Sequence, residues 1–315
     1  MNKIISIVGP TGSGKTAKAL ELAQNVLGRN SFADTGLTQF LGNSDFTGVD
    51  LISVDSRQVY KGLEILSGAD VPEHFARISD ADFEYFKHTE LDITLHGVSI
   101  VELEQEWSVA HFRNFVIAIL YKSFENNRLP ILVGGTGMYY LQLFNTDSNL
   151  YVPPNEKIRQ KAQGMTVLEL QEWLAKFDSQ KLESMNNSDR NNPRRLMRAI
   201  EIASGKPELH SNRELPANLE NYSMVLEVAL DDLKEKIVKR VAERFDAGAV
   251  EEVQNVLQIC GTNDYQVCST LGVSDISRFL SGEITQEQCL TDWSLHEFQY
   301  AKRQLTWFKK YSIVI

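Results

Sequence analysis

Residues 9–16 read Gly9-Pro10-Thr11-Gly12-Ser13-Gly14-Lys15-Thr16, a complete match to the pattern G-x-x-x-x-G-K-[ST]. An apolar run, Ile4–Val8, precedes the motif, and an amphipathic segment, Thr16–Leu27, follows it. A strand, a glycine loop and a helix in this order are the setting that the motif needs in order to bind phosphate. Backbone N–H groups would surround a di- or triphosphate, Lys15 would neutralise its charge, and the Thr16 hydroxyl would suit Mg²⁺. The motif specifies the ligand group and leaves the reaction open.

The composition is that of an ordinary globular protein, with 43% hydrophobic and 23% charged residues in a chain of 315. The net charge of −10 disfavours a general nucleic-acid coat but leaves room for a local basic surface. Taken alone, each basic cluster is more typical of a solvated helix face. The two clusters are Arg190, Arg194, Arg195 and Arg198, and Lys302, Arg303, Lys309 and Lys310 interleaved with Trp307, Phe308 and Tyr311.

No apolar run reaches the length of a membrane span, so we expect no membrane association. The first residues carry no cleavage-site pattern, which predicts no signal peptide and a cytoplasmic location. The cysteines, Cys260, Cys268 and Cys289, lack metal-ligand spacing. We therefore expect free thiols, buried or half-buried, in a reducing cytosol.

Strand-like and helix-like segments alternate in the N-terminal half, which predicts an α/β fold with a P-loop NTPase-like parallel sheet flanked by helices. After Pro153-Pro154 the chain becomes polar and helical as far as Gly205, which indicates an inserted helical domain. The expected division is a P-loop core over 1–152, a helical insertion over 153–212, and the second part of the core with the C-terminal helices over 213–315. Further expected elements are a surface loop over 29–48, strands at Leu51–Val54, Ile131–Val133 and Met224–Leu230, a helix from Met138, a helix capped by Asp231 that runs to Phe245, and a closing helix over 297–311.

Two more motifs follow expected strands. Asp55-Ser56-Arg57-Gln58-Val59-Tyr60 comes directly after Leu51–Val54, so Asp55 would face the same crevice as the phosphate loop. Two roles for Asp55 stay open: an aspartate that holds Mg²⁺ through water, which the residue pattern alone slightly favours, and a general base. Gly134-Gly135-Thr136 would allow close backbone approach and supply a hydroxyl, although alone it is typical of a tight turn.

The three motifs in this order resemble the tRNA dimethylallyltransferase family, also called tRNA isopentenyltransferases. The resemblance covers nearly the whole chain. Four other segments contribute to it: Trp107–Arg113, Asn191–Glu201, Arg240–Val253 and Ala301–Trp307.

The resemblance implies transfer of a dimethylallyl group from dimethylallyl diphosphate to the exocyclic amine of an adenine next to the anticodon in tRNA. Asp55 would accept the amine proton, and Thr136 would hydrogen-bond near the amine and the leaving oxygen. Mg²⁺, held at Thr16, would assist departure of the diphosphate. The diphosphate would be bound by Gly9, Pro10, Thr11, Gly12, Ser13, Gly14, Lys15, Thr16 and Arg240.

The resemblance also implies the tRNA anticodon stem-loop as partner, with the target adenine flipped out of its stack. We expect the enzyme to be a monomer, although the sequence does not give the oligomeric state. Ser269–Ser274 departs from the family pattern, because an aromatic and a basic residue are missing there. Arg278, one helical turn beyond Ser274, would compensate by reaching back. The residues implied in tRNA binding are Asp55, Ser56, Arg57, Gln58, Arg159, Arg194, Arg195 and Arg198, of which Arg194 and Arg198 would share a helix face.

Three alternatives remain at this point. The first is a P-loop small-molecule kinase that binds ATP, which the Asp55 and Gly134 motifs disfavour. The second is a prenyltransferase acting on free adenine nucleotides, which would not need the helical insertion. The third is an RNA-binding protein that has lost activity, against which the intact motif residues argue.

Overall fold

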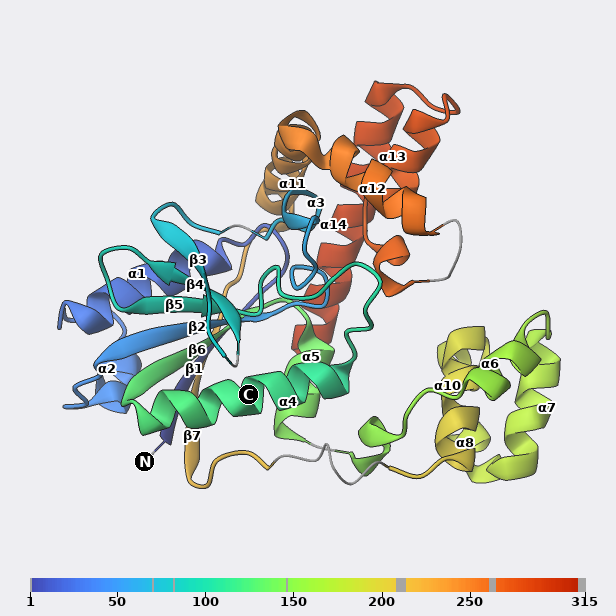
Figure 1. Cartoon of the computed structure of the whole chain (residues 1–315), viewed down its shortest axis with the longest axis horizontal. Helices are drawn as coiled ribbons and strands as arrows, with labels where there is room; N and C mark the ends of the chain where they lie inside the picture. The colour runs from blue at the N-terminus through green and yellow to red at the C-terminus, as the bar shows by residue number, and fades with distance from the viewer. Residues whose placement is uncertain are drawn as a thin grey trace. The chain divides into compact units, whose positions relative to one another are not determined.

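The computed structural model describes residues 2–69, 71–81, 83–145, 147–207, 214–260 and 265–310. The chain divides into two compact units. The core unit consists of Met1–Phe144 and Leu215–Ile315, and the helical unit consists of Asn145–Glu214 (Figure 1). The sequence-based division placed the insertion at 153–212.

A seven-stranded sheet organises the core unit, with the strand order β3-β4-β5-β2-β6-β1-β7. The five strands from β5 to β7 are parallel, as predicted, and an antiparallel hairpin of β3 and β4 extends the sheet beyond β5. The hairpin was not predicted. The strands are β1 (Asn2–Val8), β2 (Gly48–Val54), β3 (Phe75–Ser79), β4 (Glu84–His88), β5 (Ile93–His96), β6 (Arg128–Gly134) and β7 (Leu219–Val225).

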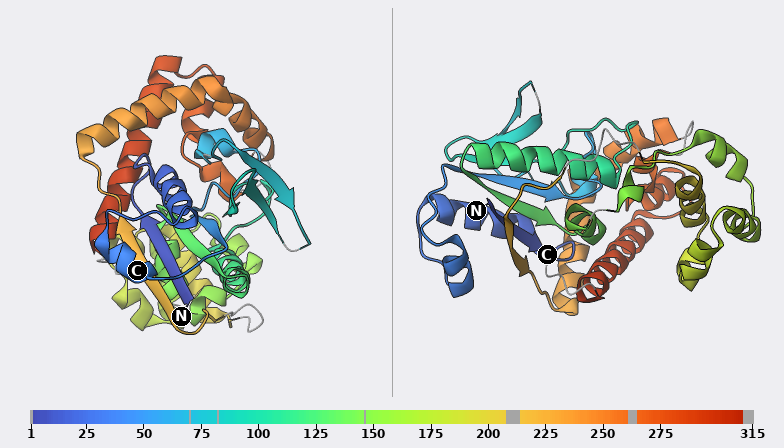
Figure 2. Two further views of the ribbon diagram at one scale, coloured as in Figure 1. Left: turned by 90° about the vertical axis from the view of Figure 1, so that its left-hand side faces the viewer. Right: turned by 90° about the horizontal axis from the view of Figure 1, so that it is seen from below.

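Helices enclose both faces of the sheet (Figure 2), as a parallel sheet with largely buried central strands requires. Alternate residues of one strand serve opposite faces: Ile5 belongs to the buried cluster that includes residues of α1 and α2, whereas Ile4 belongs to the cluster that includes residues of α4, α5, α11 and α14. The helices named here are α1 (Lys15–Leu27), α2 (Thr35–Leu41), α4 (Val109–Glu125), α5 (Gly137–Phe144), α11 (Leu230–Arg244) and α14 (Gln286–Lys310); the core unit also contains α3 (Glu64–Ser67), α12 (Val250–Cys260), the 3₁₀ turn η4 (Gln266–Ser269) and α13 (Val273–Leu280).

The prediction of a surface loop over 29–48 is wrong, because this segment contains α2 and the first residue of β2. The Asp34 carboxylate caps α2 by accepting hydrogen bonds from the backbone N–H groups of Gly36 and Leu37. Leu37 and Leu41 lie one turn apart and are buried. One buried pair among polar residues does not make a repeating apolar pattern long enough to predict a helix.

Two boundaries in the second part of the core differ from the predicted ones. The strand expected at Met224–Leu230 is β7, which ends at Val225, where its parallel pairing with Val8 ends. Helix α11 begins at Leu230, so Asp231 lies in its first turn and is not its cap. The closing helix α14 begins eleven residues before the predicted start at Glu297 and is described to Lys310; Tyr311 lies outside the described residues.

The helical unit has a small apolar core of its own, made of Leu170, Leu174, Leu196, Ala199 and Ile200. Its longest helix, α10, begins at Pro193 with Asn192 as the cap, which is the preferred use of both residues. The unit contains η1 (Ser148–Tyr151), α6 (Glu156–Ala162), α7 (Val167–Phe177), α8 (Ser179–Ser184), α9 (Asn187–Arg190) and α10 (Pro193–Ser204).

The expectation of three free thiols is wrong for two cysteines, because Cys260 and Cys268 form a disulfide. Cys260 ends α12 and Cys268 lies in η4, which brings their Cα atoms to 5.8 Å, a separation that a disulfide can span. Cys289 is free and buried. In the described part of the chain, no helix has the length and apolar character needed to cross a membrane.

Candidate active site

Neighbouring parallel strands bring the three predicted motifs together. Val8 of β1 and Val54 of β2 both pair with Gly134 of β6, so the three strands end at the same level of the sheet. The phosphate loop, Asp55 and the Gly134 motif each begin at or directly after one of these residues. The carboxyl ends of the central strands therefore form the floor of one site.

The phosphate loop has the conformation that its glycines permit. Gly12 and Gly14 have φ angles of 78° and 83°, in the left-handed region that favours glycine. The Lys15 ammonium group donates to the Pro10 carbonyl at 2.7 Å, which holds the lysine over the loop. Among the described residues, the buried Ser13 hydroxyl has no hydrogen-bond partner. A loop with such a hydroxyl and the N-terminus of α1 beside it fits a bound phosphate.

A cavity of about 710 Å³ lies over this floor, with a volume in the range of small-molecule sites. It brings together most of the residues predicted for donor and acceptor binding. Thr136 does not line it, and its hydroxyl is buried without a well-formed hydrogen bond in the described structure. The predicted residues that line the cavity are Thr11, Gly12, Gly14, Lys15, Thr16, Asp55, Ser56, Arg57, Gln58 and Arg240.

Arg240 reaches the phosphate loop from α11. Its guanidinium group hydrogen-bonds the Thr11 hydroxyl and lies 3.6 Å from the Glu297 carboxylate. Glu297 is 5% exposed and also lies 3.4 Å from Arg244, so two guanidinium groups share one carboxylate. The Arg240 Nε is buried and has no partner among the described residues. A buried guanidinium donor beside the phosphate loop suits a diphosphate oxygen.

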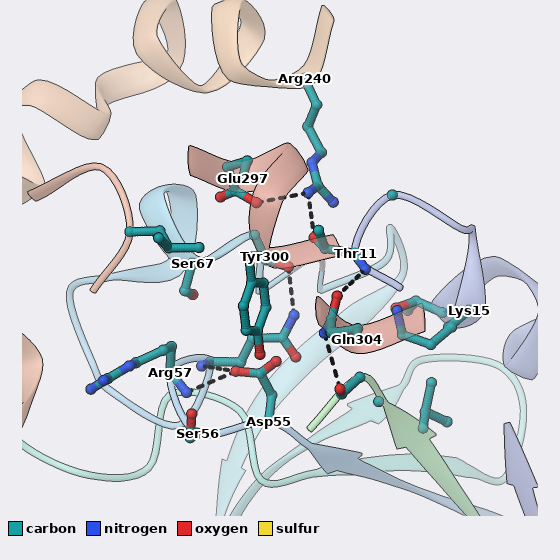
Figure 3. A pocket seen from close by; sticks show the side chains of 18 of the residues that line it. Thr11, Lys15, Asp55, Ser56, Arg57, Ser67, Arg240, Glu297, Tyr300 and Gln304 are labelled. Carbon is teal, nitrogen blue, oxygen red and sulfur yellow. Dashed lines mark hydrogen bonds and ion pairs between the residues drawn. The ribbon is translucent and has the colours of Figure 1, made fainter. Parts of the chain in front are cut away.

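A turn fixes the Asp55 carboxylate at the cavity wall. Its Oδ1 accepts hydrogen bonds from the backbone N–H groups of Arg57 and Gln58, at 2.7 and 3.2 Å (Figure 3). The described residues contain no group of three or more His, Cys, Asp or Glu side chains that could hold a metal. A Mg²⁺ ion here would have the Thr16 hydroxyl and substrate phosphate oxygens as ligands, which fits the way Mg²⁺ is bound with phosphates.

Arg57 and Gln58 are held by other parts of the protein. The Arg57 guanidinium donates to the Gln266 carbonyl at 2.6 Å and to the Ser269 hydroxyl at 3.0 Å. The Gln58 amide accepts from the Ser53 hydroxyl at 2.8 Å and donates to the Gly68 carbonyl at 2.7 Å. These hydrogen bonds hold the Arg57 and Gln58 side chains in fixed positions, where both line the cavity.

Helix α14 contributes residues to which no role was assigned from the sequence. Tyr300 lines the cavity near Asp55 (Figure 3). Burial raises the pKa of Tyr300 to about 12, the negative charge of Asp55 adds to the rise, and the nearby Thr136 hydroxyl opposes it. Tyr300 adjoins the Ala301–Trp307 segment that carries the family resemblance, and this was the one available signal.

Gln304 joins two of the motifs. Its Oε1 accepts from the backbone N–H of Thr11 at 2.8 Å, and its Nε2 donates to the Gly135 carbonyl at 3.0 Å. A Cβ at Gly135 would lie 2.2 Å from the Gln304 Nε2, and one at Gly137 would lie 2.1 Å from the Trp307 ring. These glycines are therefore required by the close approach of α14.

Four of the five predicted tRNA-binding arginines lie in the helical unit, and three of these four make ion pairs; the fifth, Arg57, lies in the core unit. Glu201 is 1% exposed and binds Arg159 at 2.9 Å and Arg198 at 3.1 Å. Arg198 also donates to the Val152 carbonyl at 2.7 Å, which gives it a structural role in this unit. Arg195 pairs with Asp189, and Arg194 is exposed.

The expected compensation by Arg278 finds no support in its contacts. Arg278 and Ser274 do share helix α13, one turn apart. However, the guanidinium of Arg278 binds Glu283 at 2.8 Å and Asp292 at 3.1 Å, away from Ser274. These two carboxylates neutralise the charge that an RNA contact would need.

The sheet and its cavity define a P-loop protein in which the phosphate loop and a carboxylate share one pocket. The family model described as IPP transferase matches residues 58–311, and the chain belongs to this family. It is 31% identical to the tRNA dimethylallyltransferase of Dictyoglomus turgidum, over 97% of this chain and 84% of that protein. The corresponding protein of Staphylococcus aureus is 30% identical, over 98% and 91%.

Solved structures agree with this assignment. The tRNA isopentenylpyrophosphate transferase of Bacillus halodurans matches with a TM-score of 0.59 and 26% identity, over 98% of this chain and 87% of that one. A eukaryotic dimethylallyltransferase acting on tRNA matches with a TM-score of 0.70 over 98% and 70%. At 21% identity, the second match supports the fold alone.

Proposed function

We propose that the chain transfers the dimethylallyl group of dimethylallyl diphosphate to the exocyclic amine of an adenine next to the anticodon of tRNA. The observation that carries the proposal is the shared cavity, in which the phosphate loop and Asp55 leave neighbouring strands at the same level. A diphosphate on the loop would place its allylic carbon beside a carboxylate. The membership of the family supports the same reaction.

In this reaction, the amine nitrogen of adenine forms a bond to the allylic carbon while the carbon–oxygen bond to diphosphate breaks. Lys15 and Arg240 would stabilise the negative charge that develops on the leaving oxygen. The Asp55 carboxylate would accept the proton that the amine loses. Mg²⁺ held at Thr16 would supply further charge neutralisation on the diphosphate.

Thr136 has a more distant place in this scheme than the resemblance implies. Its hydroxyl lies beside the Tyr300 phenol and does not line the cavity. We infer that Thr136 acts by orienting Tyr300 next to the reacting groups.

We expect the enzyme to act in the cytoplasm and as a monomer.

Labelled substrates test the proposal against its alternatives. The purified protein is incubated with Mg²⁺, labelled dimethylallyl diphosphate, and either unmodified tRNA or AMP. Label in tRNA and none in AMP is the expected result, whereas label in AMP would identify a free-nucleotide prenyltransferase. A parallel incubation with γ-labelled ATP tests the kinase alternative, since phosphate transfer with no prenyl transfer would overturn the proposal.

A further inference from the structure

Two short segments line the reaction cavity on the side away from the phosphate loop. One consists of residues 66–68 at the end of α3, and the other consists of residues 269–271 at the end of η4. We call these two segments together the α3–η4 wall. In Figure 3, Ser67 of α3 lies on the opposite side of Tyr300 from Lys15. Because a diphosphate would occupy the phosphate loop, this wall would border the acceptor.

Hydrogen bonds connect η4 to the motif that follows β2. The Arg57 guanidinium donates to the Gln266 carbonyl at 2.6 Å and to the Ser269 hydroxyl at 3.0 Å. Arg57 lines the cavity on the same side of Tyr300 as Ser67 (Figure 3). A shift of η4 would therefore change both the wall and the position of Arg57.

Helix α12 is attached to both segments of the wall. Its Glu252 carboxylate accepts hydrogen bonds from the backbone N–H groups of Ile65 and Leu66, at 2.9 and 2.7 Å, which fixes α3. Its last residue, Cys260, forms the disulfide with Cys268 of η4. One helix is thus tied to α3 by hydrogen bonds and to η4 by a covalent bond. The disulfide therefore limits how far the two segments of the wall can separate.

Thiol–disulfide exchange can open this covalent link. Cys260 and Cys268 are both half-buried, so a small thiolate can reach their sulfur atoms, whereas Cys289 is free and buried. A dithiol reductant supplies two electrons and two protons: the sulfur–sulfur bond breaks, each cysteine sulfur gains a proton, and the reductant forms its own disulfide. Disulfides of cytosolic proteins are usually transient and catalytic or redox-sensing, and the cytoplasm is where we expect this enzyme to act.

We propose that the Cys260–Cys268 disulfide is a redox switch that controls the α3–η4 wall and, through it, the use of tRNA. The inference rests on the proposed function, because the acceptor is the ligand that this wall would border. In the oxidised enzyme, η4 stays tied to α12 and holds Arg57 in place. In the reduced enzyme, the loop that the disulfide closes gains conformational freedom, and η4 leaves Arg57 for part of the time. A wall that is already ordered binds its ligand without the entropic cost of ordering, so the oxidised enzyme uses tRNA more efficiently.

The test compares the enzyme treated with oxidised glutathione and the enzyme treated with dithiothreitol. Alkylation followed by mass spectrometry should count one free thiol in the oxidised protein and three in the reduced protein. Cys260→Ser and Cys268→Ser lack the disulfide under both conditions, and Cys289→Ala is the matched control that keeps it. Initial rates at varied tRNA give kcat/KM, the dissociation constant of dimethylallyl diphosphate is measured separately, and hydrogen exchange reports on η4.

Reduction should lower kcat/KM for tRNA about tenfold, which is the loss expected when one hydrogen bond to a charged group such as Arg57 is broken. Exchange in η4 should become faster, and the affinity for dimethylallyl diphosphate should stay unchanged. The Cys260→Ser and Cys268→Ser proteins should match the reduced wild type under both conditions, whereas Cys289→Ala should respond to dithiothreitol as the wild type does.

An equal kcat/KM in both states, or a higher value in the reduced enzyme, overturns the inference, whatever the exchange in η4. Three free thiols after treatment with oxidised glutathione also overturn it, and so does a response of Cys260→Ser to dithiothreitol that equals that of the wild type. A protein that prenylates tRNA in neither state contradicts the proposed function instead. Exchange in η4 would then still show whether the disulfide holds the wall.

Discussion

Asp55 can be tested for its role in proton transfer without disturbing the turn that holds it. Asn in its place keeps an oxygen that can accept from the N–H groups of Arg57 and Gln58, so the loop should keep its form. Asp55→Asn should lower kcat by roughly two to four orders of magnitude, which is the usual range for loss of a general base. Single-turnover kinetics with tRNA measure this change.

Donor binding separates the two roles of Asp55. A general base contributes little to the ground-state affinity for dimethylallyl diphosphate, so the dissociation constant of the donor should stay near the wild-type value. A collapse of donor affinity in the Asp55→Asn protein would instead assign Asp55 to Mg²⁺.

Tyr300 should make the core unit less stable as the pH becomes strongly alkaline. Burial raises its pKa from 10.0 to about 12, so the folded protein retains a proton that the unfolded chain releases. This contribution is fully present below pH 10 and is lost as pH rises through about 12. The free energy of unfolding should therefore fall more in the wild type than in Tyr300→Phe between these values.

Denaturant titrations at a series of pH values measure the difference. Tyr60, Tyr139 and Tyr140 also have raised pKa values, but they are present in both proteins and cancel in the comparison. Parallel stability curves for wild type and Tyr300→Phe would show that the Tyr300 phenol is already solvated in the folded state.

At the scale of elements, α10 illustrates how an arginine cluster can stabilise its own unit. Glu201 is 1% exposed, so its negative charge needs the nearby arginines. Arg198→Ala removes one partner and two backbone contacts, and should destabilise the helical unit by about 1–3 kcal/mol. Arg195→Ala removes an exposed ion pair and should change stability by no more than about 0.5 kcal/mol.

Circular dichroism during denaturant unfolding measures both variants, and RNA titration shows whether either arginine also contacts the substrate. Equal stability of the Arg198→Ala and Arg195→Ala proteins would mean that Arg159 alone satisfies Glu201. In that case Arg198 would again be a candidate for binding RNA phosphate.

The strand-end motifs could be predicted from the sequence because each one is a contiguous segment with its own glycine, aspartate or hydroxyl. Their convergence followed from a general property of parallel sheets. Gln304 and Glu297 could not be predicted in the same way, because they reach the motifs from a helix that is distant in the sequence. Their contacts with Thr11 and Arg240 depend on how α14 packs.

The sequence analysis also missed elements in which buried residues do not recur over several turns or strand positions. Helix α2 buries one pair of leucines, and β3 is exposed along nearly its whole length, so neither has a pattern that a period can reveal. The end of β7 is set by pairing with β1, which the sequence of β7 alone does not contain.

At the scale of the whole molecule, the two units differ in how much apolar surface they bury. The helical unit has a core of five buried side chains among the described residues. The core unit has two far larger buried clusters, one on each face of the sheet. A unit that buries less apolar surface is less stable. The helical unit should therefore unfold locally at a lower free energy than the core unit. The amides of α7 and α10 should then exchange with solvent before those of β1, β2 and β6.

Hydrogen exchange followed by mass spectrometry measures this order on the intact chain. Exchange in β2 is the internal reference, because every residue of that strand is buried. RNA that contacts the helical unit would slow exchange in α7 and α10 by stabilising the folded form of that unit. Dimethylallyl diphosphate, for which we propose a site in the core unit, would leave their exchange unchanged. Simultaneous exchange of α10 and β2 would show that the two units open in a single cooperative step, and the separate stability of the helical unit would have to be abandoned.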